Sequence, residues 1–201
     1  MGIDLWSVPV LLDSEPVQVI RRDAAVWEAA SWRAPFSDDF GDHEEPLPEV
    51  NRAMLLGRPS GLDALSGPWH SGSRGYERAE YAFDPATFRD GHETRERSLP
   101  YRIIHGDRRF ADHAVSGQGM TWRCSARAFL IEAADAIEAL DEAAVRSEFS
   151  IEDMVRSGVY KVRPNDDEDE TFARAMDDLR WLARYYRDVA SHGYDLIVIL
   201  D

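Results

Sequence analysis

Apolar positions near the end of the chain repeat with the period of an α-helix. Between residues 171 and 192 they recur at steps of three and four, at Phe172, Met176, Leu179, Ala183, Tyr186 and Ala190. This spacing predicts a helix that buries one face, and Gly193 suits the left-handed position that ends a helix. Residues 196–200 form a continuous apolar run, which is typical of a strand covered on both faces. We therefore expect an interior strand there.

Shorter patterns predict further elements upstream. Short strands are expected at residues 3–8, 17–20, 120–124 and 159–162, whereas residues 76–83 fit a strand or a helical turn equally well. Ser125 and Ser150 are suited to cap helices within residues 126–156.

These elements predict one α+β domain over residues 1–201. In it, a small mixed sheet that includes the C-terminal strand packs against several helices. Residues 33–75 are rich in glycine, proline and acidic side chains, which predicts a divergent or enlarged loop-rich region.

The chain is strongly acidic, with 38 Asp and Glu against 23 Lys and Arg and a formal charge of −15. This charge disfavours nucleic acid and anionic membrane surfaces as partners, because each would be repelled. A basic protein is the partner that the charge favours, although the charge also serves solubility. Two acidic segments, 38–45 and 166–170, are the candidate docking surfaces.

The single cysteine, Cys124, excludes an intramolecular disulfide and fits a reducing cytoplasm. No apolar run is long enough to span a membrane, and the opening residues lack the basic start of a signal peptide. We therefore expect a cytoplasmic protein that does not bind a membrane.

Few residues suggest chemistry. Metal-ligand types cluster at His105, Asp107, Asp112 and His113, but two neighbouring arginines would repel a cation, which favours a polar loop. Cys124 precedes a predicted helix, where a thiol can be activated. It alternates with Met120 and Trp122, however, and no base lies nearby, so a buried structural thiol is the better interpretation. We assign no catalytic residue, no metal site and no cofactor.

Several stretches from Tyr76 onward resemble the YfbM-like family of uncharacterised bacterial proteins, a domain of unknown function. They are residues 83–85 (FDP), 100–106 (PYRIIHG), 119–122 (GMTW), 140–142, 148–151, 159–160, 185–186 and 196–199. The resemblance implies a compact α+β fold and no transferable catalytic residue. A Trp/His stretch usual in the first half of that family is missing, and Lys161 stands where the family has proline.

Two functions follow as hypotheses. The first is a non-catalytic binding or interaction module with an acidic surface, because no complete catalytic set is present. The alternative is a small enzyme or ligand-binding protein that uses a cleft near His105, Trp122 and Tyr160. Convergence of these three side chains on one concave pocket would favour the alternative.

Overall fold

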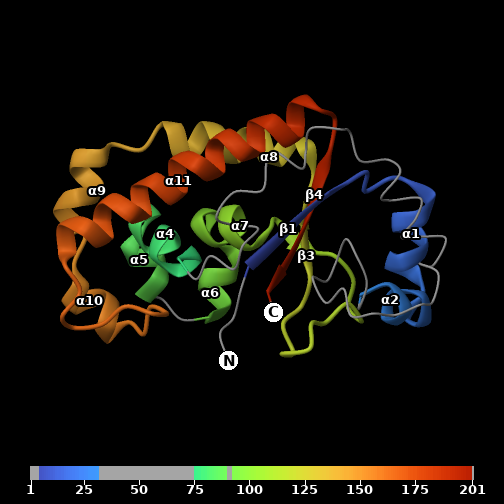
Figure 1. The fold of residues 1–201 in the computed structure, drawn as a ribbon, viewed down its shortest axis with the longest axis horizontal. Coiled ribbons are helices and arrows are strands. Elements are labelled where there is room, and N and C mark those ends of the chain that lie inside the picture. The colour runs from blue at the N-terminus through green and yellow to red at the C-terminus, as the bar shows by residue number, and fades with distance from the viewer. Residues whose placement is uncertain (1–4, 32–74, 90–91, 201) are drawn as a thin grey trace, which may run out of the picture.

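The computed structural model describes residues 5–31, 75–89 and 92–200, and Figure 1 shows how their elements are arranged. The loop-rich region predicted at 33–75 lies outside these residues apart from Gly75, and so does the acidic segment 38–45. In chain order the elements are β1 (Leu5–Val10), α1 (Glu15–Arg22), α2 (Ala24–Ser31), α4 (Tyr76–Phe83), α5 (Pro85–Arg89), α6 (His92–Arg97), α7 (Leu99–His105), β2 (Arg108–Arg109), β3 (Arg123–Ser125), α8 (Arg127–Glu138), α9 (Glu142–Glu148), α10 (Ile151–Arg156), α11 (Glu168–Ser191) and β4 (Asp195–Leu200).

The C-terminal strand lies inside a four-stranded sheet of order β1-β4-β3-β2. It pairs with β1 through Leu5 and Leu200, and with β3 through Cys124 and Ile197. The predicted interior strand and the α+β class are thus confirmed. All the pairings among the described strands are antiparallel, so the sheet is not mixed as we expected. An apolar run marks burial on both faces, and an antiparallel strand acquires such burial when helices cover both sides.

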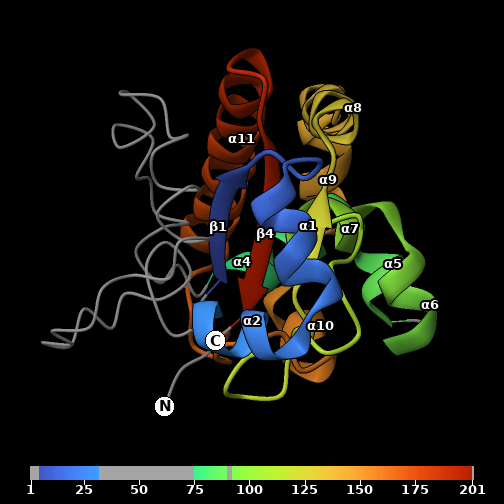
Figure 2. The ribbon, with the colours of Figure 1, turned by 90° about the vertical axis from the view of Figure 1, so that its right-hand side faces the viewer.

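Both faces of the sheet are covered by helices. Alternate β4 side chains, Leu196, Val198 and Leu200, belong to the core formed with α4, α7, α8 and α11. The intervening Ile197 and Ile199 belong to a second core on the other face. Helices α1 and α2 contribute to that second core, and Figure 2 shows them in front of the strands. The period-two alternation therefore divides one apolar strand between two cores.

Helix α11 spans the larger core and packs against α8 and α4. Its start is capped by Asp167, whose side chain accepts a hydrogen bond from the Glu170 amide, and three acidic residues occupy its first turn. Leu179 is fully buried, and the Tyr186 hydroxyl donates to the Ile103 carbonyl of α7. Across the described ranges, no helix combines the length and apolar character needed to cross a membrane.

Two short predicted strands are wrong. Residues 17–20 belong to α1, where Pro16 occupies the first turn and Val17 and Ile20 face the core at helical spacing. Residues 159–162 form a turn in which Lys161 has a φ of 62°. For residues 76–83, where the sequence left two options open, the structure has the helix α4. In all three segments packing decides the conformation, because runs of only four to eight residues fit either period.

Candidate functional site

Helix α7 carries the longest stretch of the resemblance, PYRIIHG. Ser98 caps this helix by accepting a hydrogen bond from the Tyr101 amide, and Pro100 occupies the first turn. The helix ends at Gly106, whose φ of 98° favours glycine. A Cβ on Gly106 would lie 2.9 Å from the Cβ of Arg123, so glycine is also what lets strand β3 approach the end of α7.

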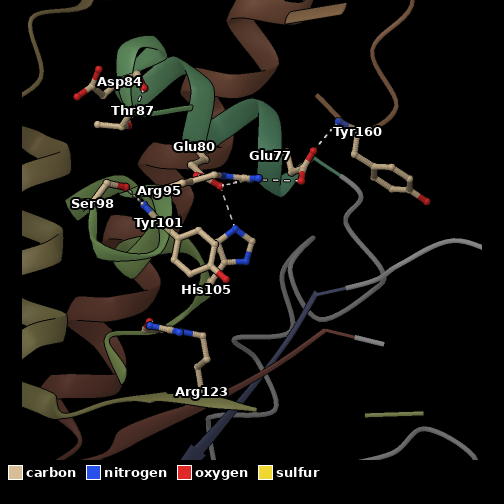
Figure 3. Close-up of polar contacts among 11 residues, drawn as sticks. Glu77, Glu80, Asp84, Thr87, Arg95, Ser98, Tyr101, His105, Arg123 and Tyr160 are labelled. Atoms are coloured by element: carbon tan, nitrogen blue, oxygen red, sulfur yellow. Dashed lines mark hydrogen bonds and ion pairs between the residues drawn. The ribbon is translucent and has the colours of Figure 1, made fainter. Parts of the chain in front are cut away.

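A buried ion cluster lies between α4 and α7. Glu80 is fully buried and accepts two hydrogen bonds from Arg95, at 2.6 and 2.7 Å. The His105 Nε2 atom lies 2.9 Å from the same carboxylate, and Arg95 also reaches Glu77 at 3.3 Å. Figure 3 shows these side chains converging on Glu80. The spacing of Glu77 and Glu80 places both carboxylates on one face of α4.

The electrostatics of this cluster keep Glu80 ionised. Burial by itself raises the pKa of Glu80, but the hydrogen bonds from Arg95 and His105 outweigh it and hold the pKa below its ordinary value. Burial by itself would lower the pKa of Arg95, but the hydrogen bonds to Glu80 and the charge of Glu80 raise it above its ordinary value. An ionised carboxylate only accepts hydrogen bonds, so Nε2 of His105 donates the proton in this contact. The buried Nδ1 atom of His105 has no hydrogen-bond partner among the described residues.

Aromatic rings connect this cluster to strand β3. The Tyr101 ring stacks on the His105 ring with centroids 4.1 Å apart, and the Arg123 guanidinium lies 5.2 Å from the Tyr101 centroid (Figure 3). Burial raises the pKa of Tyr101, so its hydroxyl stays protonated at neutral pH. The polar and aromatic side chains thus form a continuous column from buried Glu80 to Arg123.

Arg123 lies at the wall of an open cavity of about 600 Å³. Its lining comes from α6, α7, β2, β3 and the turn after α7, and consists of Glu96, Arg97, Arg102, Asp107, Arg109 and Arg123. Among these described lining residues, four guanidiniums against two carboxylates give a formal charge of +2. A cationic cavity on a chain of formal charge −15 is a local reversal of the average field.

The arginines of the cavity are held differently. Arg102 donates to Asp107 at 2.8 Å, which neutralises both groups. Arg123 donates through Nε to the Gly106 carbonyl at 2.8 Å and through Nη2 to the Asp107 carbonyl at 3.2 Å, so its guanidinium is fixed by backbone oxygens. Its Nη1 atom and the Nη2 atom of Arg109 each lie 4.0 Å from Oε2 of Glu96. The cavity therefore has a rigid guanidinium, Arg123, and an exposed one, Arg109.

The three predicted binding residues do not meet in one place. His105 and Tyr160 both contact Tyr76, with ring centroids 5.6 and 6.2 Å away. The Tyr160 amide is held by Glu77 at 2.6 Å. Trp122 belongs to the core on the other face of the sheet, where its ring lies 5.6 Å from that of Trp27. None of the three is among the residues that line the cavity.

The polar cluster around residue 105 is also divided. His105 contacts Glu80, Asp107 contacts Arg102, and the Nε2 atom of His113 lies 3.2 Å from the Ile20 carbonyl. Within the part of the chain that the structure describes, no three His, Cys, Asp or Glu side chains form a group that could hold a metal ion. Cys124 is fully buried, as its alternation predicted, and burial raises its pKa.

The arginine cavity was not predicted from the sequence. Its four arginines belong to four separate elements, so no motif with fixed spacing joins them. The available signals were the Arg108–Arg109 pair and Arg102 within the PYRIIHG stretch. Both were interpreted only as obstacles to a metal ion or as family markers.

Comparisons with known proteins agree with this fold. Among curated proteins none matches the chain. A solved structure that resembles it is the crystal structure of a protein of unknown function, YfbM, from Escherichia coli. The two share 18% identity with a TM-score of 0.51, over 63% of this chain and 76% of that one. The sequence model of the family described as "Domain of unknown function (DUF1877)" matches residues 91–199, which is just over half of the chain and includes α7, the cavity and α11. The chain therefore belongs to this family, the domain of unknown function DUF1877.

Proposed function

We propose that this protein is a non-catalytic binding protein that takes a small anionic molecule in the arginine cavity. The observation that carries the proposal is the cavity itself, which four arginines line on an otherwise acidic chain. Its volume of about 600 Å³ is within the range of small-molecule sites. Guanidinium groups are the usual protein partners of carboxylate and phosphate. The proposal develops the ligand-binding alternative and places it beside α7 rather than at Trp122.

The cavity is partly prepared for an anion before one binds. The Arg123 side chain is only 10% exposed, and the carbonyls of Gly106 and Asp107 fix its guanidinium. A ligand that meets this group immobilises no flexible side chain there, which lowers the entropic cost of binding. The overall negative field repels anions elsewhere, so an anion concentrates where the field reverses.

Binding is favoured over catalysis by where the reactive groups lie. Cys124 is buried with a raised pKa, and His105 directs Nε2 to Glu80. Neither residue lines the cavity. A nucleophile must reach both substrate and base, and neither side chain does so from these positions. A reducing cytoplasm, which the sequence predicts, suits this lone thiol.

The alternative partner, a basic protein, gains less support from the structure. The carboxylates of Glu168 and Asp169 pair with Arg146 at 3.1 and 2.6 Å, and Glu170 pairs with Arg174. Asp167 caps α11, and Asp166 accepts from the Arg163 amide. The acidic run 166–170 thus serves the start of α11 and its neighbours. Association with a basic protein through the chain's net charge stays a prediction.

Calorimetric titration with inorganic phosphate, sulfate and succinate at low ionic strength tests the proposal. The Arg109 side chain is 60% exposed, and among the described residues its one ion pair is the 4.0 Å contact with Glu96, so Arg109→Ala should leave the fold intact. We expect this change to weaken anion binding about tenfold. The matched control is Arg174→Ala, which removes an exposed arginine outside the cavity and should leave affinity unchanged. If no anion binds, or if both variants lose affinity equally, the proposal is wrong.

A further inference from the structure

The charges that line the arginine cavity do not cancel, and their imbalance indicates what kind of anion fits. Asp107 neutralises Arg102 through direct hydrogen bonds. Among the described residues that line the cavity, the remaining charges are those of Arg97, Arg109 and Arg123 against the carboxylate of Glu96. The net charge of these four groups is +2, so a bound monoanion would leave the cavity with excess positive charge. A dianion balances it.

The position of Glu96 marks where an anion would lie. One atom, Oε2, stands 4.0 Å from a terminal nitrogen of Arg109 and 4.0 Å from one of Arg123. Both separations exceed a hydrogen bond, so this carboxylate faces the two guanidiniums without binding either tightly. An anion with more oxygens than a carboxylate can approach both guanidiniums at hydrogen-bond distance and displace Glu96.

We propose that the ligand of this cavity is a small molecule carrying a phosphate monoester in its dianionic form, bound between Arg109 and Arg123. This inference rests on the proposed function, because it names the class of anion that the site takes. A phosphate monoester offers three acceptor oxygens and a charge close to −2 at neutral pH. A carboxylate pairs with one guanidinium through its two oxygens and leaves the second unused. Glu96 then acts as an internal competitor for the phosphate position.

The test compares phenyl phosphate, phenyl sulfate and benzoate, which share one ring and differ in the anionic group. The second phosphate proton has a pKa of about 6, so phenyl phosphate is a dianion at about pH 8 and a monoanion at about pH 5. Phenyl sulfate stays a monoanion at both pH values, so any change in its affinity with pH reports titration of the protein itself. At the higher pH we expect phenyl phosphate to bind about tenfold more tightly than phenyl sulfate, and at the lower pH we expect this advantage to vanish.

Two variants test the position. Glu96→Gln removes the competing charge and should tighten phenyl phosphate binding several-fold, whereas Arg109→Ala should remove the preference for phosphate over sulfate. Circular dichroism melting confirms that each variant is folded. If Glu96→Gln bound phenyl phosphate with unchanged affinity, the idea that phosphate competes with Glu96 for the place between Arg109 and Arg123 would be wrong.

The remaining outcomes separate the two proposals. Equal binding of phenyl phosphate and phenyl sulfate at the higher pH would overturn the dianion inference while leaving an anion site in place. Binding of none of the three probes would overturn the proposed function itself. Tighter binding of a phosphoserine peptide than of phenyl phosphate would overturn the small-molecule assignment.

Discussion

Glu80→Gln should destabilise the protein by about 3–5 kcal/mol, the range for removing one partner of a buried ion pair. Glu80 is 0% exposed and accepts hydrogen bonds of 2.6 and 2.7 Å from Arg95, whose side chain is itself only 15% exposed. The amide retains the shape of the carboxylate but not its charge. Arg95 would then keep Glu77, at 3.3 Å, as its nearest carboxylate.

A double-mutant cycle isolates the pair from other effects. Arg95→Met retains the apolar stem beside Phe88, over whose ring the guanidinium lies at 3.9 Å, and removes the charge. Each single change takes away the closest partner of a buried charge, whereas the double variant removes both charges. We therefore expect the two losses to be less than additive by at least about 1 kcal/mol. Free energies of unfolding come from urea titrations followed by tryptophan fluorescence.

The pH dependence of the difference provides a second measurement. The folded-state pKa of Glu80 lies below its ordinary value of 4.5, so the pair stabilises the fold fully above that pH. Its contribution declines as the pH falls through the lowered pKa, and wild type and Glu80→Gln should converge in stability there. Glu132→Gln, on the exposed face of α8, is the matched control and should behave as wild type. Additive losses in the cycle, or a difference that persists in acid, would refute the reasoning.

Three further predictions concern packing. Leu179→Ala should cost about 2–5 kcal/mol because the side chain is fully buried, whereas Arg180→Ala, with a half-exposed side chain, should change stability by at most about 1 kcal/mol; urea titration distinguishes them. Gly106→Ala should cost at least about 1–3 kcal/mol, since its φ of 98° and the Arg123 Cβ at 2.9 Å both oppose a side chain, and a wild-type melting temperature would contradict this. Cys124 should react with a thiol reagent only after denaturation, because it is buried and its pKa is raised; rapid labelling of native protein would show otherwise.

Long periodic segments were the part of the fold that the sequence could predict. Helix α11 follows the predicted stripe, because its apolar repeats extend over most of its 24 residues and a helix buries them on one face. The apolar run at 196–200 predicted an interior strand, and β4 lies between β1 and β3. Residues 17–20 and 159–162 were assigned wrongly, because four residues carry too little periodicity to separate strand, helix and turn.

For the candidate site, in contrast, most of the arrangement could not be predicted from the sequence. The sequence by itself indicated that residues around His105 mattered, through the PYRIIHG stretch, and that Cys124 would be buried. It grouped Trp122 with His105, which the two faces of the sheet separate. Only the tertiary structure brings Glu80 and Arg95 together around His105.

The arginine cavity likewise depends on the fold, because Arg97, Arg102, Arg109 and Arg123 come from four elements. Charges scattered along a chain have no sequence period. Burial patterns are local and can be read from spacing, whereas the meeting of charges is set by how elements pack, and here Gly106 sets it by allowing β3 to approach α7.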